Sequence, residues 1–422
     1  MKTRERLWEM GMNAIRELET EQGILASGRE ELYGCVFGRD SLITSLLLMR
    51  AYGKVQDPYL IGLVRKILVN LAKLQGRERN LESGEEPGKI IHEFRPDKHE
   101  HLTQQQNHPW FLYPDGIMRN YDTVDATPLF LIAVEKYYRL TGDEEFLDLV
   151  QGNVSDALAW LLTTMDDHQD GLVAYQFHPE RTSGGLRVQS WMDSAESVFF
   201  EDRDDEPAYT IAPVEVQAYA YRALSVWHLL LADSEPDLSA LLLERARQLR
   251  ERFYEHFMLP NGTPAFALDG QSRMLTSARS SMGHVLWSGA RDEGTYFSLF
   301  APEDVGRVAH RLVQPDLFVP GAGIRTLSSD SSHFEANSYH NGSVWPHDTS
   351  MIALGLRDAG FELEAGQVRD ALLKAYDHFG VPVELFTYDT KLGDYVGPTG
   401  QRACQTQAWS AAGLLAILSE EM

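Results

Sequence analysis

Apolar residues recur at helical spacing along most of the 422-residue chain, and this periodicity constrains the fold more than any other feature. One run comprises Leu129, Ile132, Ala133, Tyr137 and Leu140. Intervals of three and four residues place such side chains on one face of an α-helix. The chain is therefore predicted to be mainly helical, with each helix burying an apolar face.

The helices are expected to pair into hairpins, because the breaks between them contain residues that end one helix and cap the next. The segment 141–144, Thr-Gly-Asp-Glu, is one such break. Twelve predicted helices would form six hairpins. Their ranges are 4–25, 39–53, 57–75, 124–141, 144–165, 213–232, 236–256, 283–289, 301–313, 346–359, 364–379 and 406–420.

Clusters of polar and aromatic residues open nearly every second predicted helix. They lie at 38–41, 121–128, 191–193 with 213–215, 281–284, 339–348 and 405–409. If alternate helices form an inner ring, all inner helices begin at the same end of a toroid, and the clusters meet around one mouth. The pattern predicts an all-α (α/α)6 toroid, a single domain over residues 1–422. Long loops near 76–120 and 166–212 are expected over the mouth, since loops of that length are usually functional or disordered.

Composition excludes several classes of protein. With 38 Lys+Arg against 62 Asp+Glu, the formal net charge is −24, which opposes binding to nucleic acid or an anionic membrane. Cys35 and Cys404 belong to no zinc-type spacing and form no disulfide framework. No metal and no organic cofactor is expected. The N-terminus lacks the continuous apolar segment of a signal peptide, so a cytoplasmic location is predicted.

The ordered set of clusters resembles the amylo-α-1,6-glucosidase (glycogen-debranching) type of glycoside hydrolase, with kin among glucosylglycerate and mannosylglycerate hydrolases and processing α-glucosidases. The matching segments are Gly-Arg-Asp at 38–40, Val-Asp-Ala-Thr-Pro at 124–128, Trp-Met-Asp at 191–193, Tyr-His-Asn-Gly-Ser-Val-Trp-Pro at 339–346, Val-Glu-Leu-Phe at 383–386 and Thr-Gln-Ala-Trp-Ser at 406–410. Each segment alone is weak evidence for the resemblance, but together the segments span nearly the whole chain in the family's order. The resemblance implies an (α/α)6 catalytic domain that hydrolyses an α-glycosidic bond with inversion.

By this resemblance, Asp193 is the general acid that protonates the leaving oxygen and Glu384 is the base that activates water. Both residues precede inner helices, which independently places them at the same mouth. The apolar residues Trp191 and Met192 would raise the pKa of the Asp193 carboxyl, as a general acid requires. Glu384 has an apolar setting as well, so residue chemistry alone does not decide which carboxyl is the acid.

Sugar recognition requires planar hydrogen-bonding groups for hydroxyls and aromatic faces for the C–H surface of the ring. By the resemblance, Arg39 and Asp40 hold the non-reducing glucosyl unit. The other predicted substrate-binding residues are Asp125, Trp191, Glu215, Tyr339, His340, Trp345, Gln407 and Trp409. Trp287 is a further aromatic candidate. A plainer interpretation stays open for several of the predicted residues. Asp40 and Asp125 could be helix N-caps, Asp193 and Glu384 solvated loop carboxylates, Glu215 a solvent-facing residue, and Trp345 and Trp409 core residues.

The substrate is expected to be small. The first predicted helix begins near Arg4, without the N-terminal domains of large debranching enzymes, and a mouth capped by two loops suits a short oligosaccharide or a glucosylated solute. The main expectation is an α-glucosidic bond. Glucosylglycerate or mannosylglycerate would need a cation for its carboxylate, for which Arg95, Arg181, Arg187 and Arg325 are candidates. An (α/α)6 sugar phosphorylase and a non-catalytic carbohydrate-binding toroid stay open, and the oligomeric state is not predicted.

Overall fold

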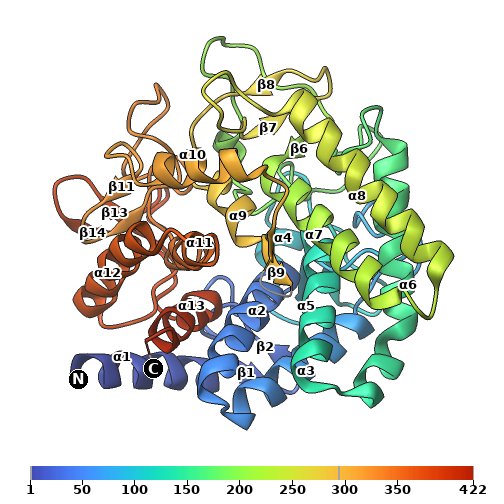
Figure 1. Cartoon of the computed structure of the whole chain (residues 1–422), viewed down its shortest axis with the longest axis horizontal. Helices are drawn as coiled ribbons and strands as arrows, with labels where there is room; N and C mark the ends of the chain where they lie inside the picture. The colour runs from blue at the N-terminus through green and yellow to red at the C-terminus, as the bar shows by residue number, and fades with distance from the viewer. Residues whose placement is uncertain (1, 293–294, 422) are drawn as a thin grey trace.

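The structure, a computed structural model, describes residues 2–292 and 295–421, and its helices form two concentric rings (Figure 1). The inner helices are α2 (Gly38–Val55), α5 (Ala126–Thr141), α7 (Val214–Leu231), α9 (Ser281–Trp287), α11 (Pro346–Asp358) and α13 (Ala408–Ser419). Each contacts the next, and α13 returns to α2, which closes the ring. The predicted (α/α)6 toroid is confirmed.

The outer ring packs against the inner one, helix by helix. It consists of α1 (Lys2–Leu18), α3 (Pro58–Lys73), α6 (Glu144–Asp167), α8 (Pro236–His256), α10 (Pro302–Leu312) and α12 (Glu362–Phe379). The short helix α4 (Glu100–Thr103) and the 3-10 turn Ala195–Ser197 lie in the two long loops. Within the described part of the chain, no helix combines the length and apolarity needed to cross a membrane.

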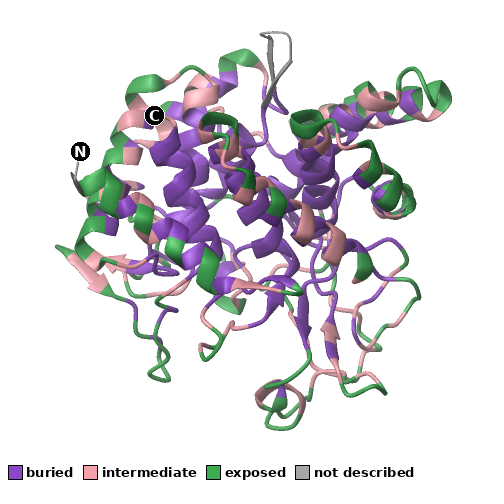
Figure 2. Ribbon diagram, turned by 90° about the horizontal axis from the view of Figure 1, so that it is seen from below, coloured by how far each residue is buried: buried purple, intermediate pink, exposed green. Residues whose placement is uncertain are grey.

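The inner helices are buried on nearly every side, as expected for helices that are surrounded by other helices. Every residue of α13 is buried, and α2 is buried without interruption from Gly38 to Met49. Figure 2 shows the buried residues concentrated on the central helices and the exposed residues on the outer helices and loops. The apolar side chains form a continuous core that reaches from Leu7 to Leu418.

The hairpins turn where the sequence predicts. Gly142 ends α5 in the left-handed conformation, with φ of 64°, and the Asp143 carboxylate then accepts a hydrogen bond of 2.9 Å from the Phe146 amide at the start of α6. The predicted helix 4–25 is too long. It ends at Leu18, because Gly23, with φ of 104°, turns the chain into the antiparallel pair β1 (Glu19–Thr20) and β2 (Gly23–Ile24).

Short antiparallel sheets connect the loops to the helical rings. One contains β3 (Val36–Phe37), β4 (Glu93–Arg95) and β5 (Met118–Asn120), and another contains β6 (Ala212–Pro213), β7 (Ala267–Leu268) and β8 (Met274–Leu275). The two-stranded sheets are β9 (Ala290–Asp292) with β10 (Thr295–Phe297), β11 (Phe318–Val319) with β12 (Gly323–Ile324), and β13 (Phe386–Tyr388) with β14 (Leu392–Asp394). Since β3 leads directly into α2 and β6 into α7, these sheets fix the loops that precede inner helices.

Candidate active site

A narrow cavity lies at the end of the ring where the inner helices begin. Its lining residues are Tyr33, Phe37, Arg39, Asp40, His92, Trp191, Asp193, Tyr339, Trp345, Glu384, Gln407 and Trp409. All of these except Tyr33, Phe37 and His92 are predicted from the sequence. The fold therefore brings Asp193 and Glu384, which are far apart in the chain, to the wall of one cavity.

Arg39, at the start of α2, is fixed by three acceptors. Its Nε donates to Asp125 Oδ2 over 2.7 Å, its Nη2 to the Ser190 carbonyl over 3.0 Å, and its Nη1 to Asp193 Oδ2 over 3.2 Å. Thr123 Oγ1 in turn donates to the other oxygen of Asp125. Because the guanidinium is buried and held from several sides, it fixes the position of Asp193 at the cavity.

The Asp193 carboxyl is partly accessible from the cavity, with 26% of the side chain exposed. Only its Oδ2 accepts a hydrogen bond from another residue among those that the structure describes, so Oδ1 is available to a ligand. Burial raises the pKa of Asp193 to about 6, against the opposing effect of the Arg39 charge. The group can therefore hold a proton in mildly acidic solution, where an ordinary aspartate is ionised.

Glu384 lies deeper than Asp193 and has a different set of partners. The Tyr339 hydroxyl donates a hydrogen bond to Oε1, and the Cys404 amide donates to Oε2 over 2.8 Å. Burial raises the pKa of Glu384 to about 7, while these two donors favour the ionised form. Both oxygens of Glu384 therefore accept hydrogen bonds, which is the arrangement expected for an ionised carboxylate.

Asp40 is a buried residue in the first turn of α2, and burial raises the pKa of its carboxyl to about 7. Gln407 Nε2 donates to Asp40 Oδ1 over a long 3.4 Å. These two polar side chains lie at the starts of adjacent inner helices, α2 and α13. The N-cap interpretation of Asp40 is wrong, because Phe37 occupies the N-cap position of α2.

Asp125, Glu215 and His340 lie behind the cavity wall. Asp125 occupies the N-cap position of α5, but its side chain makes no capping bond and binds Arg39. Glu215 is fully buried, not solvent-facing, and burial raises its pKa to about 8. His340 stacks on Trp345 with an interplanar angle of 15°. These residues therefore support the wall, and their contact with substrate stays a prediction.

Stacked aromatic rings form part of the cavity wall and pack behind it. Trp191 stacks on His284 with ring centroids 5.5 Å apart and meets Trp345 edge-on. His284 Nε2 lies 2.7 Å from Asp348 Oδ1. His347 stacks on Trp409 at 3.7 Å. The supporting histidines and Asp348 belong to the sequence clusters 281–284 and 339–348, although their structural role is not evident from the sequence.

None of the four arginines considered for a glycerate carboxylate lines the cavity. Arg95 forms an ion pair of 2.6 Å with Glu93, and Arg181 forms one of 2.6 Å with Asp122. Among the lining residues that the structure describes, Arg39 is the single Lys or Arg, and it is already paired. Trp287 lies outside this site, at the last position of α9. No group of three or more His, Cys, Asp or Glu among the described residues is arranged to hold a metal ion.

Residues 98–382 match the family model described as the mannosylglycerate hydrolase MGH1-like glycoside hydrolase domain. The chain belongs to this MGH1-like family. It is therefore a glycoside hydrolase. The match agrees with the predicted kinship to mannosylglycerate hydrolases, and the debranching type stays a prediction. No curated protein matches the chain significantly.

Solved structures agree with the fold of this MGH1-like protein. A GH63 mannosylglycerate hydrolase from Thermus thermophilus in complex with Tris has a TM-score of 0.67 and 16% identity, covering 97% of this chain and 99% of that one. The same enzyme in complex with Tris and D-glycerate has a TM-score of 0.65 and 15% identity, covering 98% and 99%. A glycosidase variant in complex with glucose has a TM-score of 0.62 and 16% identity, covering 99% and 97%.

Proposed function

We propose that the protein is an inverting α-glycoside hydrolase in which Asp193 protonates the leaving oxygen and Glu384 activates water. The observation that carries this proposal is the unequal hydrogen bonding of the two carboxyls in one cavity. Asp193 has one oxygen directed to Arg39 and the other available, so it can present a proton to a ligand. General acid catalysis of this kind requires a pKa near the working pH. This holds for Asp193 at about 6 and for Glu384 at about 7, so the hydrogen bonding and not the pKa separates the two roles.

The partners of Glu384 favour a role as base. Both of its oxygens accept hydrogen bonds, one from Tyr339 and one from the Cys404 amide. A carboxylate held in this way is a weaker nucleophile toward carbon, yet it can still take a proton from a bound water. This favours the inverting reaction, in which water attacks the anomeric carbon, over the retaining reaction, in which the carboxylate attacks.

Small α-glycosides of glycerate are the proposed substrates. The matched family and the Thermus enzyme are named for mannosylglycerate, and one structure of that enzyme holds D-glycerate. We infer that Asp40 and Gln407 bind hydroxyls of the glucosyl or mannosyl unit, with Trp345 and Trp409 against its C–H face. The narrow cavity, with the loops 76–120 and 166–212 proposed to cover its mouth, suits such a small substrate better than a polysaccharide.

A neutral aglycone is the second candidate, and the charge in the cavity favours it. Arg39 is the one Lys or Arg among the described lining residues, and Asp125 and Asp193 already neutralise it. A glycerate carboxylate would therefore have to bind through neutral donors such as the Tyr33 hydroxyl. An α-glucoside with an uncharged aglycone would need no such contact.

Proton NMR of the first turnover is expected to show release of the β-anomer of the sugar. The substrates are mannosylglycerate, glucosylglycerate, glucosylglycerol, isomaltose and maltose, each incubated with and without inorganic phosphate. Faster turnover of the two glycerates would support the glycerate proposal, and faster turnover of glucosylglycerol would select the neutral aglycone. Initial release of the α-anomer would exclude inversion. A strict requirement for phosphate would indicate a phosphorylase instead.

Tyr339→Phe is expected to lower the maximum of kcat/KM and to shift the basic limb of its pH profile to higher pH. The lost hydroxyl stabilises the ionised form of Glu384, so its removal raises the pKa of Glu384 above about 7. The active form needs Glu384 ionised and Asp193 protonated. Because the pKa of Glu384 lies above that of Asp193, about 6, the basic limb reports Glu384 and the acidic limb reports Asp193, so only the basic limb moves. Tyr395→Phe is the control, since the Tyr395 ring packs on Tyr339 and its hydroxyl does not bond to Glu384. An unchanged basic limb in Tyr339→Phe would contradict the assignment of the base.

A further inference from the structure

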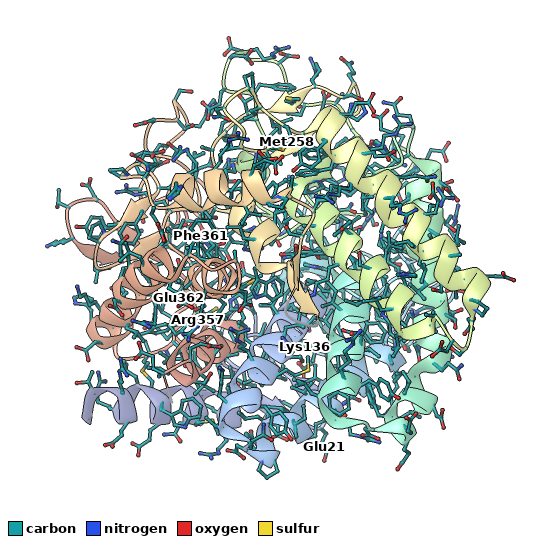
Figure 3. The ribbon with its side chains drawn as sticks, viewed as in Figure 1. Glu21, Lys136, Met258, Arg357, Phe361 and Glu362 are labelled. Carbon is teal, nitrogen blue, oxygen red and sulfur yellow. The ribbon has the colours of Figure 1, made fainter. Side chains whose placement is uncertain are left out.

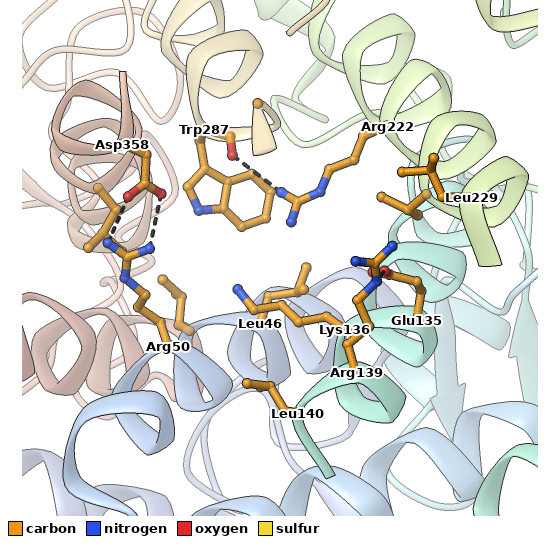
Figure 4. A pocket seen from close by; sticks show the side chains of 14 residues that line it. Leu46, Arg50, Glu135, Lys136, Arg139, Leu140, Arg222, Leu229, Trp287 and Asp358 are labelled. Atoms are coloured by element: carbon orange, nitrogen blue, oxygen red, sulfur yellow. Dashed lines mark hydrogen bonds and ion pairs between the residues drawn. The ribbon is translucent and has the colours of Figure 1, made fainter. Parts of the chain in front are cut away.

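A second cavity, of about 310 Å³, lies at the opposite end of the toroid from the active site (Figure 4). The middle and C-terminal parts of the inner helices α2, α5, α7, α9 and α11 line it, whereas the active site lies where the inner helices begin. Its volume falls within the range of small-molecule sites, which starts at about 300 Å³. The proposed hydrolysis uses none of its residues.

Basic side chains from three helices converge on this cavity: Arg50 of α2, Lys136 and Arg139 of α5, and Arg222 of α7. This local group of basic side chains contrasts with the net charge of −24 for the whole protein. Arg139 lies in the last turn of α5, where a cation complements the helix dipole, and acidic neighbours account for part of the rest of the cluster. Arg50 forms two hydrogen bonds with Asp358, of 2.8 and 3.0 Å, and Arg139 pairs with Glu135.

Lys136 is different, because it has no hydrogen bond or ion pair with any residue that the structure describes. Its ammonium points into the space between Arg50 and Arg222 (Figure 4), close to the centre of the ring (Figure 3). Burial and the two neighbouring guanidinium groups lower its pKa to about 7, although Asp358 and Glu135 oppose this. Among the residues that the structure describes, the carboxylates near Lys136 therefore do not compensate for its charge.

Trp287 forms an apolar wall beside the ammonium (Figure 4). The indole is the last side chain of α9, and its backbone carbonyl accepts a hydrogen bond of 3.4 Å from Arg222 Nη1. Leu46 and Leu229 add aliphatic surface to the same cavity. An aromatic face beside an uncompensated cation suits a ligand that has both a carbon ring and an anionic group.

We propose that this cavity binds a small sugar phosphate or sugar acid, with Lys136 and Arg222 on its anionic group and the Trp287 ring against its carbon skeleton. Phosphate and carboxylate share the property that matters here, which is a set of anionic oxygens that accept charge-assisted hydrogen bonds. Binding of such an anion restores full protonation of Lys136. The site is separate from the catalytic carboxyls, so the proposal stands independently of the proposed reaction.

Isothermal titration calorimetry of the full chain tests the proposal with glucose 6-phosphate, D-gluconate, inorganic phosphate and neutral glucose. The wild type is expected to bind glucose 6-phosphate or gluconate more tightly than glucose. Tighter binding of one of the two shows whether phosphate or carboxylate is preferred. Lys136→Met is expected to weaken that binding by about tenfold or more, because one charge-assisted contact is lost. Lys73→Met, which removes an exposed lysine from α3, should bind as the wild type does.

The proposal would be overturned if neither glucose 6-phosphate nor gluconate bound more tightly than glucose. It would also be overturned if Lys136→Met bound the preferred anion as tightly as the wild type does. A further measurement needs no substitution, should Lys136→Met not fold. Lysine side-chain NMR of the wild type is expected to show one ammonium with a pKa near 7 that rises when glucose 6-phosphate is added. A pKa that stays unchanged at saturating ligand would also refute the site.

Discussion

Asp193→Asn is expected to lower kcat for glycosides with alcohol leaving groups by about 10²–10⁴-fold, the usual contribution of a general acid. An amide cannot supply the proton that an alkoxide needs when it departs. Fluoride leaves without protonation, so the corresponding α-glycosyl fluoride should lose less than about tenfold in the same variant. The measurement is kcat on both substrates. The amide oxygen can still accept the Arg39 hydrogen bond, so the local structure is expected to persist.

A purely structural role for Asp193 has a different signature. If Asp193 served only to hold Arg39, then Asp193→Asn would lose little activity, because its amide oxygen still accepts from Arg39, and any loss would be the same for both substrates. That result would contradict its assignment as the acid. Asp204→Asn is the matched control, because Asp204 is an exposed aspartate of the same loop, 166–212, and does not line the cavity. It should keep wild-type activity on both substrates.

The site is predictable where topology alone determines position. Arg39, Trp345 and Gln407 open different inner helices, and in a toroid of hairpins all inner helices begin at the same end. No contact between distant residues had to be known to place them together. Asp193 and Glu384 follow the same logic, since each lies in a loop that leads to that end.

Other parts of the site depend on contacts that leave no local pattern. Tyr33 and His92 reach the cavity because the chain around them is held by β3 and β4, where Val36 pairs with Phe94. Strands of two or three residues are too short for a period-2 pattern to appear in the sequence. For Trp287, the local structure is predictable but the position in the toroid is not. Its helical setting is evident, but its use for sugar depends on which end of α9 it occupies, and it occupies the C-terminal end.

Glu384→Gln is expected to reduce kcat by about 10³–10⁴-fold, and by the same factor on the glycoside and on the glycosyl fluoride. Water must lose a proton when it attacks the anomeric carbon, whatever the leaving group is, and an amide cannot accept that proton. This equal loss distinguishes a base from an acid. Near wild-type hydrolysis of the fluoride by Glu384→Gln would therefore exclude Glu384 as the base.

The same substitution tests the hydrogen bonds that define the role of Glu384. The glutamine oxygen can accept from one of its two donors, Tyr339 or the Cys404 amide, but its NH₂ group then faces the other donor. A donor left without an acceptor in a buried site costs about 1–3 kcal/mol, so Glu384→Gln should also unfold at a lower temperature than the wild type. Glu335→Gln changes an exposed glutamate outside the cavity and should alter neither kcat nor the unfolding temperature. If Glu384→Gln loses activity but keeps the wild-type unfolding temperature, the two hydrogen bonds contribute little to stability. The structural argument that separates the base from the acid would then be lost.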